Sequence, residues 1–485
     1  MRHDRSVQRG VSLAGSVSLL AAAIAVLVAV WDVGAIATQV SNRDAPFGIT
    51  LVADRLSAIM VVITGVCAVA VGIYALADMD ALRERLGFHS FYHLLLGGIC
   101  GAFVTGDIFN LYVWFEVMLI SSFALLVLGS ERAQKDGAVK YVAINLISTI
   151  SFLMAIGLLY GLTGTLNMAD LHFAVREVED KGLLTTVAIF FMVGFGIKAA
   201  VFPLFFWLPA SYHTPPVTVS AIFSALLTKV GVYAIIRTFT LIFNQDVELT
   251  HNVLLVIAAL TMLTGVLGAA AQNEVRRILS FHIISQIGYM VLGVALYTPL
   301  GLLGAVFYLV HHIVVKANLF LVSGVMHRVG GSFELAYLGS LYREKPFLAI
   351  LFLIPAFSLA GFPPLSGFWA KLLLLQASLQ VDEYVIAFVA LLVGLLTIYS
   401  MTKIWTQAFW KPRPASVEAL PDRVPAAHMV LLTLPITVLA AITIVVGLWT
   451  EPFLAFAERA ADDLLNPAAY LTAVLGEAAT AEVRP

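Results

Sequence analysis

The sequence predicts an all-helical, polytopic integral membrane protein. Of its 485 residues, 60% are hydrophobic and only 12% are charged, whereas a soluble domain carries about 25% charged residues. No polar stretch is long enough to form a soluble domain of its own. A transmembrane β-barrel would alternate apolar and polar residues in segments of about ten, so the solid apolar runs exclude it. We therefore expect residues 1–450 to form a single transmembrane domain.

The apolar runs give the expected spans, because about 17 to 25 apolar residues cross a bilayer as a helix. Thirteen runs qualify, near 11–31, 50–77, 90–106, 108–129, 141–163, 183–208, 216–241, 252–271, 278–297, 301–327, 347–372, 384–409 and 428–450. The first run follows three arginines, as in a secretory signal peptide, but it is too long for one. We expect it to remain as a membrane span.

The cations predict the orientation of these spans. Sixteen lysines and arginines, among them Arg2 and Arg423, lie at one set of span ends, and six, among them Arg237 and Arg484, lie at the other. The positive-inside rule then puts the N-terminus in the cytoplasm and the C-terminus outside. Residues 451–485 are expected to be a solvated, acidic, extracytoplasmic tail with a dispensable role. The acids of this tail are Glu451, Glu458, Asp462, Asp463, Glu477 and Glu482.

Ionisable residues inside the spans are the first sign of function. Glu116 lies well inside a span, and five lysines do too: Lys198, Lys229, Lys316, Lys371 and Lys403. Each costs roughly 2.5 to 3.5 kcal/mol on insertion scales, so function is the default explanation. Burial disfavours a charged amine and a nearby carboxylate favours it, which makes such a set a switchable proton relay. Lys403 lies within eight residues of Lys411 and can instead snorkel to the surface.

Histidines extend this set. His311 and His312 lie within one turn of Lys316, and His312 is four residues before it on the same helix face. His282 lies in the preceding span. A lone buried histidine is more often a satisfied core residue, but a pair beside a lysine in an apolar helix favours proton transfer.

Prolines interrupt two spans. Pro203 and Pro209 follow Lys198, and Pro363 and Pro364 precede Lys371. These spans are the sixth and the eleventh, so they lie five apart and run in opposite directions. This spacing predicts two inverted five-helix repeats with a broken helix in each, as in transporters whose ion sites lie at such breaks.

Other chemistries find no support in the sequence. There is no GxxxxGK[ST] phosphate loop, and Cys67 and Cys100 lie in apolar runs without a CxxC partner. The net charge of -2 and the absence of a basic block argue against nucleic acid as a partner. We expect a transporter subunit rather than an enzyme, with no cofactor and no resident metal.

Seven segments carry a resemblance to a known family. They are TGDIFNLYVWFEVMLISSFALLVLG (105–129), YGLTGTLNMADL (160–171), FPLFFWLP (202–209), LLTKVGVYAIIRTFTLIFN (226–244), RRILSFHIISQIGYM (276–290), HHIVVKANLFLVSG (311–324) and SLAGFPPLSGFWAKL (358–372). Over roughly residues 46 to 411 the chain resembles the D subunit of the Mrp multisubunit sodium/proton antiporters. The same family includes antiporter-like subunits of respiratory complex I and of membrane-bound hydrogenases.

The resemblance implies a fold of fourteen helices and a set of functional residues. Glu116 matches the family's essential glutamate, Lys198 its partner lysine and Lys229 the central lysine. His312 and Lys316 match the middle of the relay, and Lys371 the lysine at the far exit, where the nearest complex I subunit usually has glutamate. Family members usually open with a short helix before the stretch that starts this chain, so thirteen spans are expected here.

The resulting hypothesis is a proton-translocating subunit of a cation/proton antiporter in a bacterial inner membrane. Its expected partners are the other Mrp subunits, protons, sodium ions and lipid. One alternative is a proton-pumping subunit of a redox-driven complex. Another is an independent carrier of an organic solute, which should present a cluster of binding groups at the midplane rather than single lysines and histidines.

Overall fold

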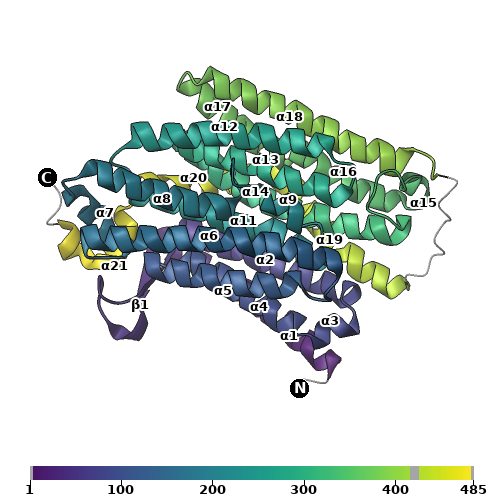
Figure 1. Ribbon diagram of the computed structural model, residues 1–485, viewed down its shortest axis with the longest axis horizontal. Coiled ribbons are helices and arrows are strands. Elements are labelled where there is room, and N and C mark those ends of the chain that lie inside the picture. Colours follow the sequence, from purple (N-terminus) through teal and green to yellow (C-terminus); the bar gives the residue numbers. More distant parts are fainter. Residues whose placement is uncertain (1–3, 415–424, 482–485) are drawn as a thin grey trace.

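The computed structural model describes residues 4–414 and 425–481 and shows an elongated bundle of helices (Figure 1). The helices are α1 (Arg5–Val33), α2 (Arg55–Asp78), α3 (Ala81–Arg85), α4 (Phe88–Val104), α5 (Ile108–Leu126), α6 (Arg132–Thr163), α7 (Met168–Glu177), α8 (Lys181–Ala199), α9 (Trp207–Ser211), α10 (Val217–Ile222), α11 (Thr228–Leu241), α12 (Val247–Ala271), α13 (Val275–Ala295), α14 (Pro299–Gly330), α15 (Leu341–Glu344), α16 (Pro346–Ala360), α17 (Ser366–Gln380), α18 (Tyr384–Ile404), α19 (Ala426–Leu448), α20 (Glu451–Leu465) and α21 (Ala468–Ala481). Three shorter helical segments are the 3-10 turn η1 (Val40–Asn42) and the π-helical η2 (Phe223–Leu227) and η3 (Trp405–Trp410).

The expected spans are confirmed. In the described ranges eleven helices are long and apolar enough to cross a membrane, and the shorter apolar helices α4 and α16 occupy the remaining two expected positions. The eleventh span, near 347–372, contains one of the two expected helix breaks. It is divided into α16 and α17, with Pro363 and Pro364 in the connection between them.

The long helices run side by side, so the bundle has two ends (Figure 1). We call them the α3 end, which also holds α15, and the β1 end, which also holds α7 and α21. A small antiparallel hairpin of β1 (Ala35–Gln39) and β2 (Thr50–Asp54) lies at the β1 end, with Ala35 paired to Asp54 and Gln39 to Thr50. Asp54 then caps α2 by accepting from the backbone N–H of Ser57, which begins the helix at this end.

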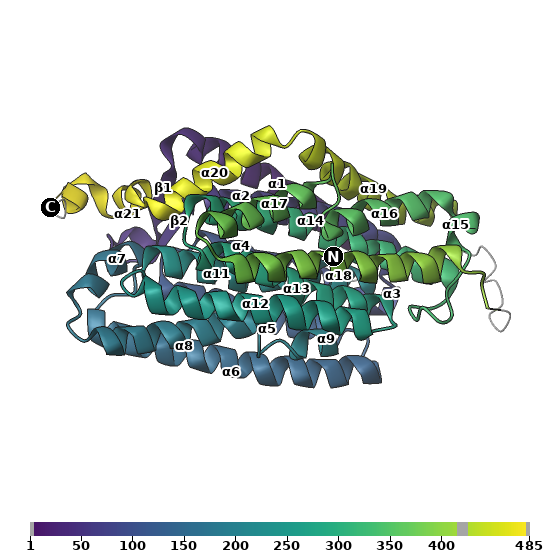
Figure 2. The ribbon, with the colours of Figure 1, turned by 90° about the horizontal axis from the view of Figure 1, so that it is seen from above.

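The core lies along three central spans. The most apolar windows of α10–η2–α11, of α13 and of α14 are each 94% buried, whereas those of α6, α12 and α19 are 39% buried. Figure 2 shows the central helices enclosed by α6 and α8 on one side and by α1 and α20 on the other. Side chains on the central spans are therefore shielded on every side, and any charge there depends on its protein neighbours.

The first expected helix break is present. α8 ends at Ala199, and residues 200–206 form turns before the short α9, with Pro203 in the turns and Pro209 inside α9. The backbone N–H of Phe202 donates to Thr261 Oγ1 at 2.9 Å, so a neighbouring helix satisfies a group that the break leaves free.

The expectation about the end of the chain needs correction, and one cation near a span end is unexpectedly buried. Residues 451–481 are not a solvated tail, since α20 packs on α14, α2 and α11, and α21 on the β-hairpin and α7. Arg237 lies near the end of α11, as expected, but it is buried, with 4% of its surface exposed. Arg2, Arg423, Glu482 and Arg484 lie outside the described residues.

Candidate functional site

Lys198 lies in the last turn of α8, beside the helix break. Its ammonium group lies over the Phe115 ring, 5.8 Å from the centroid. Glu116 follows Phe115 on α5 and lies within electrostatic range of Lys198, but no ion pair joins the two in the described part of the chain. Glu116 Oε1 is buried without a hydrogen-bond partner. The structure thus brings the expected pair into proximity but not into contact.

Lys229 occupies the centre of the bundle and is fully buried. It follows the π-helical segment η2, in which the ordinary i to i−4 pattern is interrupted. The Lys229 ammonium donates to the backbone carbonyl of Ser224, inside that segment. On the neighbouring α2, Cys67 lies within electrostatic range of Lys229. No pattern in the sequence indicates η2, although η2 supplies the hydrogen-bond acceptor for the central lysine.

The helices that carry Lys198 and Lys229 touch through their backbones. A Cβ atom placed on Gly231 would lie 2.5 Å from the Ala199 nitrogen and 2.9 Å from the Lys198 carbonyl carbon. Only a glycine fits against α8 this closely. The two lysines are consequently linked by helix packing, and Glu116 is the charged group that acts on Lys198 directly.

His312 and Lys316 lie on α14, next to Lys229, and both are fully buried. The Lys316 ammonium donates to the backbone carbonyl of Leu279 at 3.0 Å. Both ring nitrogens of His312 are buried without a hydrogen-bond partner. His312 lies within electrostatic range of Lys229, Lys316, His311 and His282, which makes it the central member of the group.

The other two histidines are each held by a serine of a neighbouring helix. His311 Nδ1 lies 2.8 Å from Ser366 Oγ, at the first residue of α17. His282 Nε2 lies 2.6 Å from Ser400 Oγ of α18. In each ring the second nitrogen is buried and unpaired. A ring with one satisfied nitrogen and one free nitrogen is suited to accept a proton from one neighbour and donate it to another.

Lys371 lies beside the second helix break. Its ammonium donates to the carbonyl of Ala360, the last residue of α16, at 3.0 Å, and lies 5.2 Å from the centroid of the Tyr289 ring. His282 and His311 are both within its electrostatic range. As expected, one lysine precedes its helix break and the other follows it.

Lys403 is set apart from this group. Its ammonium donates to the carbonyls of Ala270 at 3.1 Å and Gln272 at 2.6 Å, at the C-terminus of α12. Cations at this end of a helix satisfy its last carbonyls and interact favourably with its dipole. These contacts support the alternative to a relay role for this residue.

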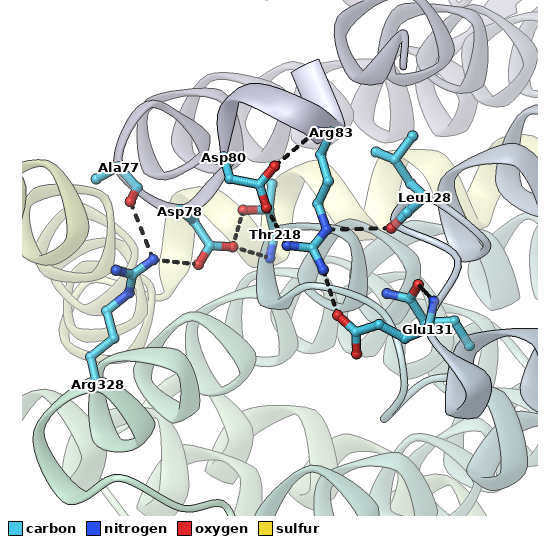
Figure 3. Close-up of polar contacts among 9 residues, drawn as sticks. Ala77, Asp78, Asp80, Arg83, Leu128, Glu131, Thr218 and Arg328 are labelled. Atoms are coloured by element: carbon cyan, nitrogen blue, oxygen red, sulfur yellow. Dashed lines mark hydrogen bonds and ion pairs between the residues drawn. The ribbon is translucent and has the colours of Figure 1, made fainter. Parts of the chain in front are cut away.

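A polar pocket of 560 Å³ opens at the α3 end. Figure 3 shows the polar contacts of Asp78, Arg83, Glu131 and Arg328, which line it. On its wall Asp78, the last residue of α2, accepts from Arg328 at 2.9 Å and from the Thr218 hydroxyl at 2.7 Å. The Arg83 guanidinium donates to Glu131 Oε1 at 2.7 Å. Because Thr218 lies in the first turn of α10, Asp78 fixes the start of the span that carries η2 and Lys229. No pattern in the sequence indicates this network.

No group of three or more potential metal-ligating side chains occurs within residues 4–414 and 425–481. The titratable groups form two sets instead. Glu116 and Lys198 make one, at the first break, and the other runs from Lys229 through His312 and Lys316 to Lys371. This arrangement can move protons laterally through the bundle, since its members, apart from Glu116, are amine and imidazole nitrogens, which gain and lose protons.

A helical membrane bundle with two broken helices and a buried line of lysines and histidines defines the class of antiporter-like subunits. A family model described as the transmembrane part of NADH:quinone oxidoreductase and Mrp antiporters matches residues 105–397. The D subunit of the Na+/H+ antiporter of Alkalihalophilus pseudofirmus is 46% identical over 472 residues, covering 97% of this chain and 95% of that protein. The chain belongs to this family, in the branch of the Na+/H+ antiporter D subunits.

Further comparisons agree. The D subunit of the Na+/H+ antiporter of Bacillus subtilis is 41% identical over 438 residues, covering 89% of this chain and 87% of that protein. A chain in the structure of the Mrp complex from Dietzia sp. DQ12-45-1b superposes with a TM-score of 0.90 at 35% identity, covering 97% of this chain and 95% of that one. A chain of the archaeal membrane-bound sulfane sulfur reductase reaches a TM-score of 0.87 at 24% identity, a likeness of fold alone.

Proposed function

We propose that this chain is the proton-translocating subunit of a multisubunit sodium/proton antiporter in a bacterial inner membrane. Its partners are the other subunits of an Mrp-type complex, and it is a transporter component rather than an enzyme. The observation that carries the proposal is the buried line from Lys229 through His312 and Lys316 to Lys371. The α3 end, where α1 begins, faces the cytoplasm, and α20 and α21 lie on the outer side.

The proton occupies one amine or imidazole nitrogen of this line at a time. A proton on Lys229 is held by the Ser224 carbonyl, and one on Lys316 by the Leu279 carbonyl. His312, with both ring nitrogens unpaired, is the group between them that can accept a proton on one nitrogen and release one from the other. Repulsion by the Lys198 ammonium, when Glu116 does not compensate it, moves the charge onward, toward His311, His282 and Lys371.

Glu116 acts on the Lys229 end of this line, through Lys198. Two unit charges about 6 Å apart at an effective dielectric of 20 interact by about 3 kcal/mol, which is a factor of about 100 in a population. The electrostatic free energy of a proton on Lys229 therefore depends strongly on whether Glu116 compensates the Lys198 ammonium. The close contact at Gly231 transmits a movement of the α8 terminus to the helix of Lys229.

Sodium is assigned to another subunit. Na+ is a hard cation and prefers several oxygen ligands, as other hard cations do, while the relay consists of nitrogens apart from Glu116. Protons move inward through this chain and sodium moves outward elsewhere in the complex. A redox-driven complex uses the same fold, but the likeness to such complexes is one of fold alone.

Sodium/proton exchange in everted vesicles tests the proposal. Vesicles with the complete complex are compared with vesicles that lack this subunit and with vesicles that contain this chain alone. We expect sodium-dependent proton movement, without any electron donor, only in the vesicles that contain the complete complex. Exchange by the complex without this subunit would contradict the proposal, and exchange that required an electron donor would favour the redox-driven alternative.

A further inference from the structure

One face of α11 carries a line of polar groups that leads away from the relay. Lys229, Tyr233 and Arg237 are four residues apart, so they lie above one another, one turn apart, over about 12 Å. The exposed fractions of these residues are 0%, 2% and 4%. The line runs from the centre of the bundle to the β1 end.

Arg237 ends this line in a buried cluster of charges. Its guanidinium pairs with Asp54 Oδ2 at 2.6 Å and donates to the Tyr233 hydroxyl at 3.2 Å. It also lies 5.1 Å from the centroid of the Tyr470 ring, which comes from α21. The Tyr233 hydroxyl donates in turn to the carbonyl of Phe103 at 2.7 Å.

A second ion pair closes the cluster from the C-terminal helices. Arg55, next to Asp54, pairs with Asp463 of α20 at 2.7 Å. Two acids and two arginines therefore balance one another, and α20 and α21 supply Asp463 and Tyr470. Burial of this kind is unfavourable unless every charge is paired, so it calls for a functional explanation.

The physical role of the arginine follows from its chemistry. An amine and a phenol hydroxyl in line can pass a proton, but a guanidinium stays protonated in proteins and accepts none. Although the cluster is balanced as a whole, the charged group that contacts the Tyr233 hydroxyl is the guanidinium, at 3.2 Å, so a positive charge faces the line and repels an approaching proton. The line from Lys229 toward the β1 end is thus blocked where it would otherwise reach the surface.

We propose that Arg237, held by Asp54 and covered by the C-terminal helices, is an electrostatic seal that keeps the proton of Lys229 from leaking to the β1 end. The inference rests on the proposed function in one respect, namely that Lys229 carries a transported proton. It adds a role for residues outside the relay and for α20 and α21. Without a seal, protons would cross the subunit at Lys229 and bypass His312, Lys316 and Lys371.

Passive proton permeability tests the seal. Vesicles with the complete complex receive a pH jump in the absence of sodium, and proton influx is followed with a pH-sensitive dye. Arg237→Gln alone leaves Asp54 buried and unpaired, so the double variant Arg237→Gln/Asp54→Asn carries the test. It removes both charges and keeps both shapes, and asparagine still caps α2. We expect influx to rise about tenfold, with assembly unchanged on native gels.

Two further variants separate a seal from a structural role. Arg237→Lys keeps a positive charge, because Asp54 beside it holds the new ammonium group protonated, and permeability should stay near the wild-type level. Adding Tyr233→Phe to the double variant removes the hydroxyl step and should return the leak to near the wild-type level. Wild-type permeability in the assembled double variant would overturn the seal, as would a leak that persists after Tyr233→Phe. Loss of exchange in Lys229→Ala tests the relay separately, because that measurement does not depend on Arg237.

Discussion

The substitution Gly231→Ala tests the contact between the helices of Lys198 and Lys229. A Cβ atom there would lie 2.5 Å from the Ala199 nitrogen and 3.0 Å from the Ala199 Cα. Ordinary carbon contacts are about 3.5 to 4.0 Å, and the atoms that clash belong to the backbone and cannot rotate away. The end of α8 must therefore move by about 1 Å.

The free energy of unfolding has two opposing contributions. Alanine is better than glycine in a helix by about 0.5 to 1 kcal/mol, and overpacking costs about 1 to 3 kcal/mol. The net effect is a loss of between about 0 and 2.5 kcal/mol. We expect sodium/proton exchange to fall about tenfold or more, because a displacement of 1 Å in a site can cost about a hundredfold.

A matched control is Gly157→Ala, on α6, where an added Cβ meets no atom within 4 Å. It gains the same helix propensity without the clash, so stability should rise slightly and exchange should not change. The assay combines vesicle exchange with thermal unfolding of the purified complex. Gly231→Ala behaving like this control would refute the argument that α8 and α11 are coupled by this contact.

The remaining predictions concern the relay and the C-terminal helices. Glu116→Gln keeps the shape of the side chain and removes its charge, so it should abolish exchange in an assembled complex, while Glu116→Asp should retain part; near-normal exchange with glutamine would end the electrostatic switch. Lys229→Ala should abolish exchange. Lys403→Ala should leave the exchange rate within about twofold, and it should lower the free energy of unfolding by about 0.5 to 1 kcal/mol because the cap on α12 is lost. Abolished exchange in an assembled Lys403→Ala complex would instead place that lysine in the relay. Truncation after Asn466 removes Tyr470 from the β1 end and should lower the thermal stability of the complex; an unchanged unfolding temperature would contradict the packing of α21.

Most of the architecture could be predicted from apolar runs and prolines, because both act locally. In the run near 347–372 the apolar composition alone does not show a break, but Pro363 and Pro364 predict it. The π-helical turn at Phe223–Leu227 has no such signal. Its residues contain neither glycine nor proline, and its geometry is decided by packing against neighbouring spans.

The packing of α20 and the burial of Arg237 are indicated by residue spacing, but the counts of charged residues point the other way. Ala457, Ala460, Ala461 and Leu464 have the spacing of a buried helix face, but the acids between them suggest a solvated tail. Counting cations places Arg237 near a span end without indicating its burial, whereas its spacing of four and eight residues from Tyr233 and Lys229 puts it on the same helix face as the buried lysine. The pairing of Arg237 with Asp54 spans 183 positions in the chain, and no local pattern predicts a contact of that range.

The π-helical turn before Lys229 has a consequence for how the central helix can move. A π turn holds one more residue than the α-helical turn it replaces. If it relaxed to α geometry, everything after it would advance by one residue, a rotation of about 100° and a shift of about 1.5 Å. Lys229 would leave the Ser224 carbonyl and face different neighbours, while α10 stayed anchored on Asp78. In this span, a small axial displacement of the helix after the π-helical turn would therefore go with a large rotation of the Lys229 side chain about the helix axis.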